Sequence, residues 1–347
     1  MNFSLLQYLL LGSVTFVFVG LITPLMRKFA IRINAIDAPI AAHKTHKAPV
    51  PYLGGVAISI GIVAASYGAV VINDSSRDNL ILASYVLVPA ILMSAMGLID
   101  DLRGLEPWPR LIVQTLTAAA VAGTLVLTDT MGVAFQNSTI NVLVSILWIV
   151  GVCNSINFFD NLDGGAAGTV AVITFFIFLI AFDRGQVLVS ALAIVTAGAT
   201  TGFLIWNRSP AKIYMGDAGA LFLGIIVSVL TIRLNPGIAP SYMSFAIPLS
   251  LMAVPILDTT VAVVSRLNRG ISPFTGGRDH LSHRLMRKGL NRKQAALALW
   301  GFSGVFGMNA LAIYQFPNSL GIILISLFLT IWVLLFAWFI RIPSVDK

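Results

Sequence analysis

The sequence predicts an all-α, polytopic membrane helix bundle of about eleven transmembrane helices, with the N-terminus outside and the C-terminus in the cytoplasm. Composition, apolar runs and the distribution of basic residues lead to this prediction. The 347-residue chain is 57% apolar and 10% charged, whereas a soluble domain carries about 25% charged residues. Too few polar residues remain to cover a soluble globule. This excludes a water-soluble enzyme, a disordered chain and a coiled coil, and the single Cys153 excludes a disulfide framework.

Eleven mostly apolar runs are long enough to cross a bilayer, which takes about 20 residues. They lie near residues 3–23, 53–73, 80–99, 109–127, 140–158, 165–182, 187–206, 217–234, 243–265, 295–314 and 319–340. Their continuity argues against a β-barrel, in which apolar and polar residues alternate. The first run has no basic segment before it and no small-residue cleavage site after it, which indicates an anchor. We expect residues 1–347 to form one integral membrane domain.

The basic residues predict the orientation. With the N-terminus outside, the cytoplasmic segments are residues 24–52, 100–108, 159–164, 207–216, 266–294 and 341–347. Nearly all lysines and arginines lie in these segments or at their edges, and the exceptions are Arg77, Arg184 and Arg233. This agrees with the positive-inside rule, by which basic residues gather in cytoplasmic loops. The net charge of +8 therefore reflects topology and attraction to the inner leaflet, and we expect no nucleic-acid partner.

An acidic pair, Asp100 and Asp101, closes the third run. Acids at membrane depth are costly and are by default functional candidates. Adjacent carboxylates repel each other unless a cation or a proton is shared. The alternative is a helix end that dips into water with Arg103 as the partner.

The fifth run ends in a polar cluster from Asn154 to Gly165. If the segment is helical, Asn157, Asp160 and Asn161 share a face, as do Asp160 and Asp163. Such a concentration of carboxylate and amide oxygens suits Mg²⁺ or a sugar. The alternative is a polar loop between two spans.

Two further acids occur at or inside later runs. Asp217 follows the segment that begins at Asn207 and is either a helix N-cap or one of the carboxylates that hold Mg²⁺ together with substrate phosphates. Asp258 lies inside the ninth run. It is either a structural partner for Arg266 or Arg269 or a substrate-binding residue, and the sequence does not separate these roles.

Two basic segments adjoin the same face. The first carries Lys44, His46 and Lys47 ahead of the motif from Pro49 to Gly55, whose prolines stiffen the entry to the second run. A positive-inside loop explains the lysines but not this motif.

The second basic segment, 266–294, carries His280, His283 and Arg284. The histidines share a face if helical, but a third zinc ligand is missing. Arg284 suits bidentate binding of phosphate. The alternative is an amphipathic helix on anionic lipid.

All these clusters adjoin one membrane face. A transporter would place polar groups near the midplane of several spans, and only Asp258 fits that pattern. Acids for a metal and cations for phosphate at the membrane surface are the equipment for phosphoryl transfer between a soluble nucleotide compound and a lipid.

Five motifs in this order resemble the polyprenyl-phosphate N-acetylhexosamine-1-phosphate transferases of the glycosyltransferase-4 type, over essentially the whole chain. They are Pro49-Val50-Pro51-Tyr52-Leu53-Gly54-Gly55, Gly97-Leu98-Ile99-Asp100-Asp101, the stretch from Asn154 to Gly164, Met215-Gly216-Asp217-Ala218-Gly219 and Asp279-His280-Leu281-Ser282-His283-Arg284. The resemblance implies transfer of N-acetylhexosamine-1-phosphate, by default GlcNAc-1-phosphate, from a UDP-sugar to polyprenyl phosphate. UMP is the second product, the metal is Mg²⁺ or Mn²⁺, and the active site faces the cytoplasm at the inner membrane.

The resemblance also implies roles for single residues. Asp217 ligates the metal with Asn157 as helper, and Asp100 and Asp101 are the catalytic acidic pair. The expected substrate-binding residues are Asp160, Asp163, Asn207, His280, His283, Arg284, Arg110, Lys44, His46 and Lys47. Ser282 replaces the middle histidine of the His-x-His-His motif that WecA-like members carry.

The motifs favour WecA- and TagO-like members, because the Pro-Thr-Met-Gly-Gly motif and the histidine triplet of the phospho-MurNAc-pentapeptide transferases (MraY) are absent. That branch and a multi-span transporter are the alternatives, and a homodimer is possible. We expect direct in-line attack by the lipid phosphate, with a two-step route through an aspartyl-phosphate on Asp100 or Asp101 as the competing mechanism.

Overall fold

The computed structural model describes residues 3–37, 49–73 and 77–344, and it is helical almost throughout. The α-helices are α1 (Leu5–Arg32), α2 (Gly54–Asn73), α3 (Arg77–Arg103), α4 (Pro107–Leu127), α5 (Ser138–Phe159), α6 (Gly165–Asp183), α7 (Val187–Asn207), α8 (Gly216–Arg233), α9 (Ser241–Leu251), α10 (Ala253–Leu267), α11 (Leu281–Arg287), α12 (Arg292–Gln315) and α13 (Ser319–Arg341). Two short strands, β1 (Ile36–Asp37) and β2 (Val50–Pro51), pair antiparallel.

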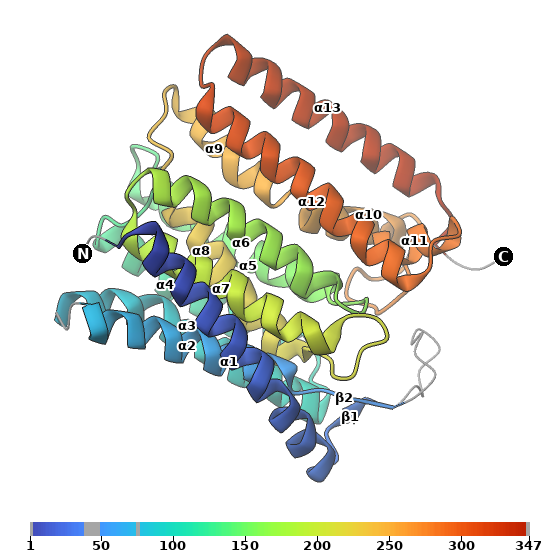
Figure 1. Ribbon diagram of the computed structural model, residues 1–347. Coiled ribbons are helices and arrows are strands. Elements are labelled where there is room, and N and C mark those ends of the chain that lie inside the picture. Colours follow the sequence, from blue (N-terminus) through green and yellow to red (C-terminus); the bar gives the residue numbers. More distant parts are fainter. Residues whose placement is uncertain (1–2, 38–48, 74–76, 345–347) are drawn as a thin grey trace.

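The expected membrane bundle is confirmed. Among the described residues, ten helices are long and apolar enough to cross a membrane. The run at 243–265 is broken into α9 and α10, which meet at 68° and together provide an eleventh candidate span. The long helices lie side by side, and the start of α1 and the end of α13 lie at opposite ends of the bundle (Figure 1), as an odd number of spans requires.

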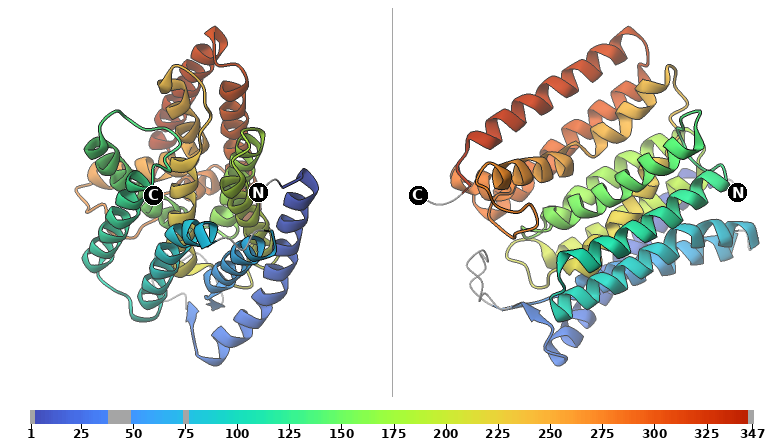
Figure 2. Two further views of the ribbon diagram at one scale, coloured as in Figure 1. Left: turned by 90° about the vertical axis from the view of Figure 1, so that its left-hand side faces the viewer. Right: turned by 180° about the vertical axis from the view of Figure 1, so that it is seen from behind.

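Helix α8 is the centre of the bundle, and every residue from Ala218 to Thr231 is buried. Helices α2, α3 and α5 pack around it, whereas α13 lies at one edge of the bundle and α1 at the other (Figure 2). Because α8 starts at Gly216, its N-terminal end brings Asp217 among the ends of α3 and α5. The fold thus places the acidic motifs on one shared end.

Two glycines set how closely these helices approach. A Cβ added to Gly97 of α3 would lie 2.4 Å from the backbone carbonyl carbon of Asp217, and one added to Gly55 of α2 would lie 2.1 Å from the backbone nitrogen of Gly219. Both distances are shorter than any real contact, so no larger residue fits at either position. Glycine in these motifs is therefore explained by close packing against the start of α8.

Candidate active site

The sequence motifs meet around one cavity of about 580 Å³ at the end of the bundle where α8 begins. Its lining includes Asp37, Tyr52, Asp101, Arg110, Asn157, Phe158, Asp160, Asn161, Asp163, Asn207, Tyr214, Asp217, Arg266, His280, His283 and Arg292. These residues come from segments more than 250 positions apart. The cavity is of the size that holds small-molecule ligands.

The Pro49–Gly55 motif ties the second span to the start of α8. Tyr214 donates its backbone N–H to the carbonyl of Pro51 over 2.9 Å, and Gly54 donates to the carbonyl of Tyr214 over 3.0 Å. Tyr52 donates its hydroxyl to the backbone carbonyl of Asp101 over 3.0 Å. The motif therefore holds α2, α3 and the segment before Asp217 together.

Asp101 caps the helix that carries Asp217. Its Oδ1 accepts the backbone N–H of Asp217 over 3.0 Å, and its Oδ2 accepts that of Ala218 over 3.1 Å. These two N–H groups belong to the first turn of α8, where intrahelical partners are missing. The N-cap residue of α8 is Met215, and Asp217 lies one residue inside the helix. The N-cap alternative for Asp217 is thus wrong, and its carboxylate is available for other contacts.

One arginine bridges two of the acids. Arg110 donates from Nη1 to Oδ2 of Asp100 over 2.7 Å and to Oδ2 of Asp217 over 3.0 Å. Asn157 donates from Nδ2 to Oδ1 of Asp217 over 2.7 Å. Arg110, not Arg103, is therefore the cation that pairs with Asp100, and it links this acid to Asp217.

Asp160 carries the clearest sign of excess negative charge. Helix α5 ends at Phe159, so Asp160 is its C-cap residue and the stretch from Asp160 to Gly164 is a turn rather than further helix. Burial, and to a lesser extent the charges of Asp217, Asp101 and Asp163, raise the pKa of Asp160 to about 8. A cation placed among these carboxylates would relieve that repulsion.

The donor set fits a magnesium-type ion that is completed by substrate. Within the described ranges, no group of three or more His, Cys, Asp or Glu side chains has the geometry to hold a metal ion alone. Mg²⁺ usually takes one or two carboxylates and fills its other positions with water and substrate phosphates. Asp217, with the carboxylates of Asp101 and Asp160 nearby, supplies that kind of incomplete set.

Across the cavity, Asp258 holds His280 in a fixed orientation. His280 donates from Nδ1 to Oδ2 of Asp258 over 2.7 Å, and the backbone N–H of Leu281 donates to Oδ1 over 2.7 Å. The other ring nitrogen, Nε2, lies 3.3 Å from Nη2 of Arg266. Neither expected partner of Asp258 is correct, because Arg266 and Arg269 both pair with Asp279.

His283 also reaches the cavity, from the short helix α11. It is mostly buried, and this desolvation, helped by the charge of His280, lowers the pKa of His283 to about 4. A neutral imidazole is therefore expected at this position at neutral pH. Such a group can donate or accept a hydrogen bond but adds no positive charge.

Comparison with known proteins agrees with this geometry. The model of glycosyl transferase family 4 matches residues 83–235, which include Asp100, Asp101, Asp160, Asp163 and Asp217. The probable undecaprenyl-phosphate N-acetylglucosaminyl 1-phosphate transferase of Bacillus subtilis is 31% identical over 327 residues, covering 93% of this chain and 86% of the relative. The chain belongs to glycosyl transferase family 4.

Other members of the family are similar over different lengths. The decaprenyl-phosphate N-acetylglucosaminephosphotransferase of Mycolicibacterium smegmatis is 31% identical over 319 residues, 82% of this chain and 77% of the relative. A phospho-N-acetylmuramoyl-pentapeptide-transferase of Streptococcus thermophilus is 30% identical over 164 residues, 43% of this chain and 48% of that protein.

Two residues that were expected to bind substrate, Asn207 and Asp163, use their side chains for hydrogen bonds or ion pairs within the protein. Asn207 borders the cavity, but its amide accepts the N–H of Gly164 over 3.0 Å and donates to the carbonyl of Ile213 over 2.9 Å. Asp163 accepts the N–H of Ala211 over 3.2 Å and pairs with Arg292 at 3.6 Å. Both hold the turns that frame the cavity.

Arg284 lies elsewhere than expected. Its side chain is 1% exposed, and it donates to the carbonyls of Asp279 and Phe339 over 2.8 Å each and to that of Ile342. It does not line the cavity. The proposed phosphate contact is thus not seen, because the guanidinium is directed toward the carbonyls at the end of α13.

Three other expected residues, Lys44, His46 and Lys47, lie outside the described residues. In contrast, four residues that were not expected to be site residues border the cavity, namely Tyr52, Tyr214, Phe158 and Arg266. Tyr52 and Tyr214 lie inside or beside the motifs, so their position was the available signal. Arg266, at the end of an apolar run, could have been found as a basic residue at membrane depth.

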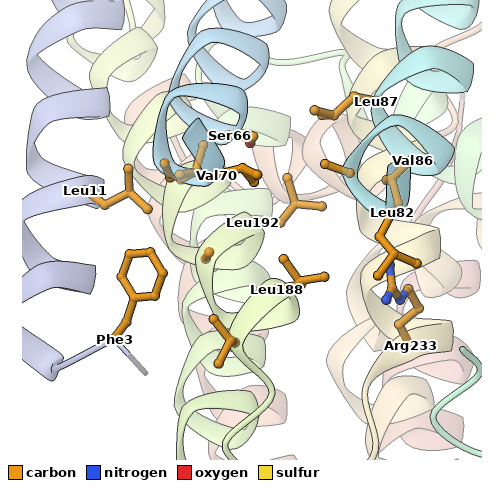
Figure 3. Close-up of a pocket in the computed structure, with 15 residues that line it drawn as sticks. Phe3, Leu11, Ser66, Val70, Leu82, Val86, Leu87, Leu188, Leu192 and Arg233 are labelled. Atoms are coloured by element: carbon orange, nitrogen blue, oxygen red, sulfur yellow. The ribbon is translucent and has the colours of Figure 1, made fainter. Parts of the chain in front are cut away.

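A second, smaller cavity lies at the opposite end of α8 (Figure 3). Its volume is about 50 Å³ and its lining is mostly apolar, with Leu11, Val70 and Leu192 around it and Arg233 at one side. Arg233 is 16 residues beyond Asp217 on α8, which places it about 24 Å from Asp217 along the helix axis. This cavity has neither the size nor the acids for a metal-assisted transfer.

Proposed function

We propose that this protein transfers N-acetylhexosamine-1-phosphate, by default GlcNAc-1-phosphate, from a UDP-sugar to polyprenyl phosphate and releases UMP. The observation that carries the proposal is that Asp101, Asp160, Asp217 and Arg110 line one cavity at the end of the bundle, where Arg110 links Asp217 to Asp100. The printed names of the two relatives matched over most of this chain describe the same class of reaction.

Mg²⁺ or Mn²⁺ would be held by Asp217, with Asn157 orienting that carboxylate. When bound, the metal supplies positive charge to the phosphates of the sugar nucleotide and stabilises the leaving UMP. Asp101 keeps the start of α8 in place through its two backbone hydrogen bonds. Arg110 holds Asp217 in position from the opposite side.

In the reaction, an oxygen of the lipid phosphate attacks the phosphorus that carries the sugar, and the bond from that phosphorus to the UMP oxygen breaks. A phosphate monoester has its second pKa near 6, so the lipid phosphate is mostly dianionic at neutral pH and needs little base catalysis. The protein must mainly reduce repulsion between two anionic reactants. His280, fixed by Asp258 beside Arg266, is placed to bind one of the phosphates or the sugar.

The active face is proposed to be cytoplasmic. The basic segments that border the cavity support this orientation through the positive-inside rule. The pentapeptide-transferase alternative is supported less, since its relatives match less than half of this chain. A transporter is supported less as well, because the acids gather at one end of the bundle instead of at the midplane.

The direct test is an assay with purified protein, Mg²⁺, a short polyprenyl phosphate and a panel of UDP-sugars. We expect UMP release with UDP-GlcNAc that depends on the lipid. Asp217→Asn should reduce turnover by about a hundredfold or more while the protein stays folded, and Asp183→Asn, at the other end of the bundle, should be active. Near-normal turnover of Asp217→Asn would refute the metal assignment.

A further inference from the structure

A third cavity, of about 720 Å³, borders the reaction cavity at the same end of the bundle. It lies among α1, α7 and α12, with Phe16 of α1, Leu204 of α7 and Trp300 of α12 in its lining. Asp163 is the one described side chain that lines both cavities. The two spaces therefore adjoin each other but have different walls.

The polar side of this cavity is strongly basic. Arg208, Lys212 and Lys293 line it, and all three are exposed. Lys212 places its ammonium 5.3 Å from the ring centre of Trp206. In the described part of the chain, the side chains of Arg208 and Lys293 have neither an ion pair nor a hydrogen bond. The one acid, Asp163, is already paired with Arg292, so the net charge of the site is positive.

The other side of the cavity is apolar and open to the membrane. Ile205 of α7 is 42% exposed and Leu297 of α12 is 49% exposed, and both line the cavity. Because both helices are candidate membrane spans, we expect these exposed side chains to contact lipid. A soluble anion would gain nothing from such a wall, whereas a lipid with an anionic head group would use both sides.

We propose that this cavity binds an anionic glycerophospholipid of the cytoplasmic leaflet as a non-substrate ligand. Basic pockets between membrane helices on the cytoplasmic side are known to bind such head groups. None of the three cations lines the reaction cavity, and neither Asp217 nor Arg110 lines this one. A phosphate held by Arg208, Lys212 and Lys293 is thus outside the reacting centre, which argues against the acceptor lipid as occupant.

The bound lipid would join α12 to the segment that leads into Asp217. Lys212 already accepts the side chain of Arg27 at its backbone carbonyl over 2.9 Å and donates its N–H to the carbonyl of Trp206 over 2.8 Å. A head group between Lys212 and Lys293 adds a link from this segment to α12. The proposal does not depend on the transferase reaction and can be tested without sugar nucleotide.

The test uses the purified, delipidated full-length protein and measures binding of phosphatidylglycerol and phosphatidylcholine with identical acyl chains by native mass spectrometry. We expect one phosphatidylglycerol to bind in preference to phosphatidylcholine. The double variant Lys212→Gln/Lys293→Gln should weaken phosphatidylglycerol binding about thirtyfold, at roughly fivefold per cation. Both lysines are exposed, so the double variant should melt at the same temperature as the unaltered protein without lipid.

The matched control is Lys288→Gln/Arg341→Gln, which removes two exposed cations outside the cavity and should leave the affinity unchanged. Equal affinity for the two lipids would overturn the proposal, as would unchanged phosphatidylglycerol binding in the double variant. Stoichiometric displacement of phosphatidylglycerol by polyprenyl phosphate would also overturn it and would assign the cavity to the acceptor lipid.

Discussion

Asp101 holds the first turn of α8 by accepting the backbone N–H of Asp217, so one carboxylate positions the backbone of another. This contact joins the end of α3 to the start of α8 at the point where Gly97 allows them to touch. Two acids far apart in sequence thus form one unit. The arrangement separates the positioning role of Asp101 from the metal-ligand role that we propose for Asp217.

Substitution of Asp101 should therefore affect stability as well as turnover. Asp101→Ala removes both acceptors from the first turn of α8, and loss of such a cap costs about 0.5–2 kcal/mol. Asp101→Asn retains one acceptor oxygen and should be intermediate. Thermal unfolding in detergent measures the order of stability of the unaltered protein, Asp101→Asn and Asp101→Ala. Equal stability of these three proteins would contradict the capping role.

Asp258 should act on turnover through His280. Asp258→Asn offers one acceptor where the carboxylate offers two, for the imidazole and for the N–H of Leu281. We expect at least a tenfold loss of kcat with a small change in stability, by analogy with other carboxylate–histidine pairs that fix a tautomer. Asp258→Ala should in addition lose about 1–3 kcal/mol, because a buried N–H is left unpaired.

This pair is assessed by comparing Asp258→Asn with His280→Gln and with the double variant. If Asp258 acts only by orienting His280, the double variant should be no less active than His280→Gln alone. Additive losses of kcat would show that Asp258 has a separate role.

The pH dependence of stability should reveal the buried charge of Asp160. The pKa of this carboxyl is raised to about 8 in the folded protein, whereas an unfolded aspartate ionises near pH 4. Between these values the unfolded chain binds fewer protons, so this group makes folding less favourable as pH rises from about 4 to about 8. In metal-free buffer, the melting temperature should fall less steeply over this range in Asp160→Asn.

His283 has the opposite effect at lower pH. Its pKa is lowered to about 4 in the folded protein, so its contribution to stability is lost as pH falls from about 6.5 toward 4. The comparison for Asp160 is therefore made between about pH 6.5 and 8. If the melting temperature changes equally steeply with pH in this window in Asp160→Asn and in the unaltered protein, the raised pKa of Asp160 is contradicted.

Arg284 should behave as a structural residue. Burial lowers the pKa of its guanidinium to about 10, so it remains charged at neutral pH. Arg284→Lys cannot reach the carbonyls of Asp279, Phe339 and Ile342 together, and each buried carbonyl left unpaired costs about 1–3 kcal/mol. We expect a clear loss of thermal stability with KM for the UDP-sugar unchanged, and a selective rise in KM at unchanged stability would restore the phosphate-binding role.

Much of the architecture could be predicted because its causes are local in sequence. Hydropathy over about 20 residues determines a membrane span, and all eleven expected runs correspond to helices or to the bent pair α9–α10. The motifs that carry Asp100, Asp160 and Asp217 were recognisable for the same reason, since acids beside apolar runs are costly and rare. The sequence by itself thus determined the fold class and the candidate acids.

Only the tertiary structure decided how these residues divide their tasks. Three of these assignments depend on contacts between segments that are distant in sequence. They are the pairing of Arg110 with Asp100, the capping of α8 by Asp101 and the pairing of Asp258 with His280. The same holds for Arg284, whose partners are carbonyls more than 50 residues away. Hydropathy sets which segments cross the membrane, but close packing at glycines and the need to pair every buried polar group set which side chains meet.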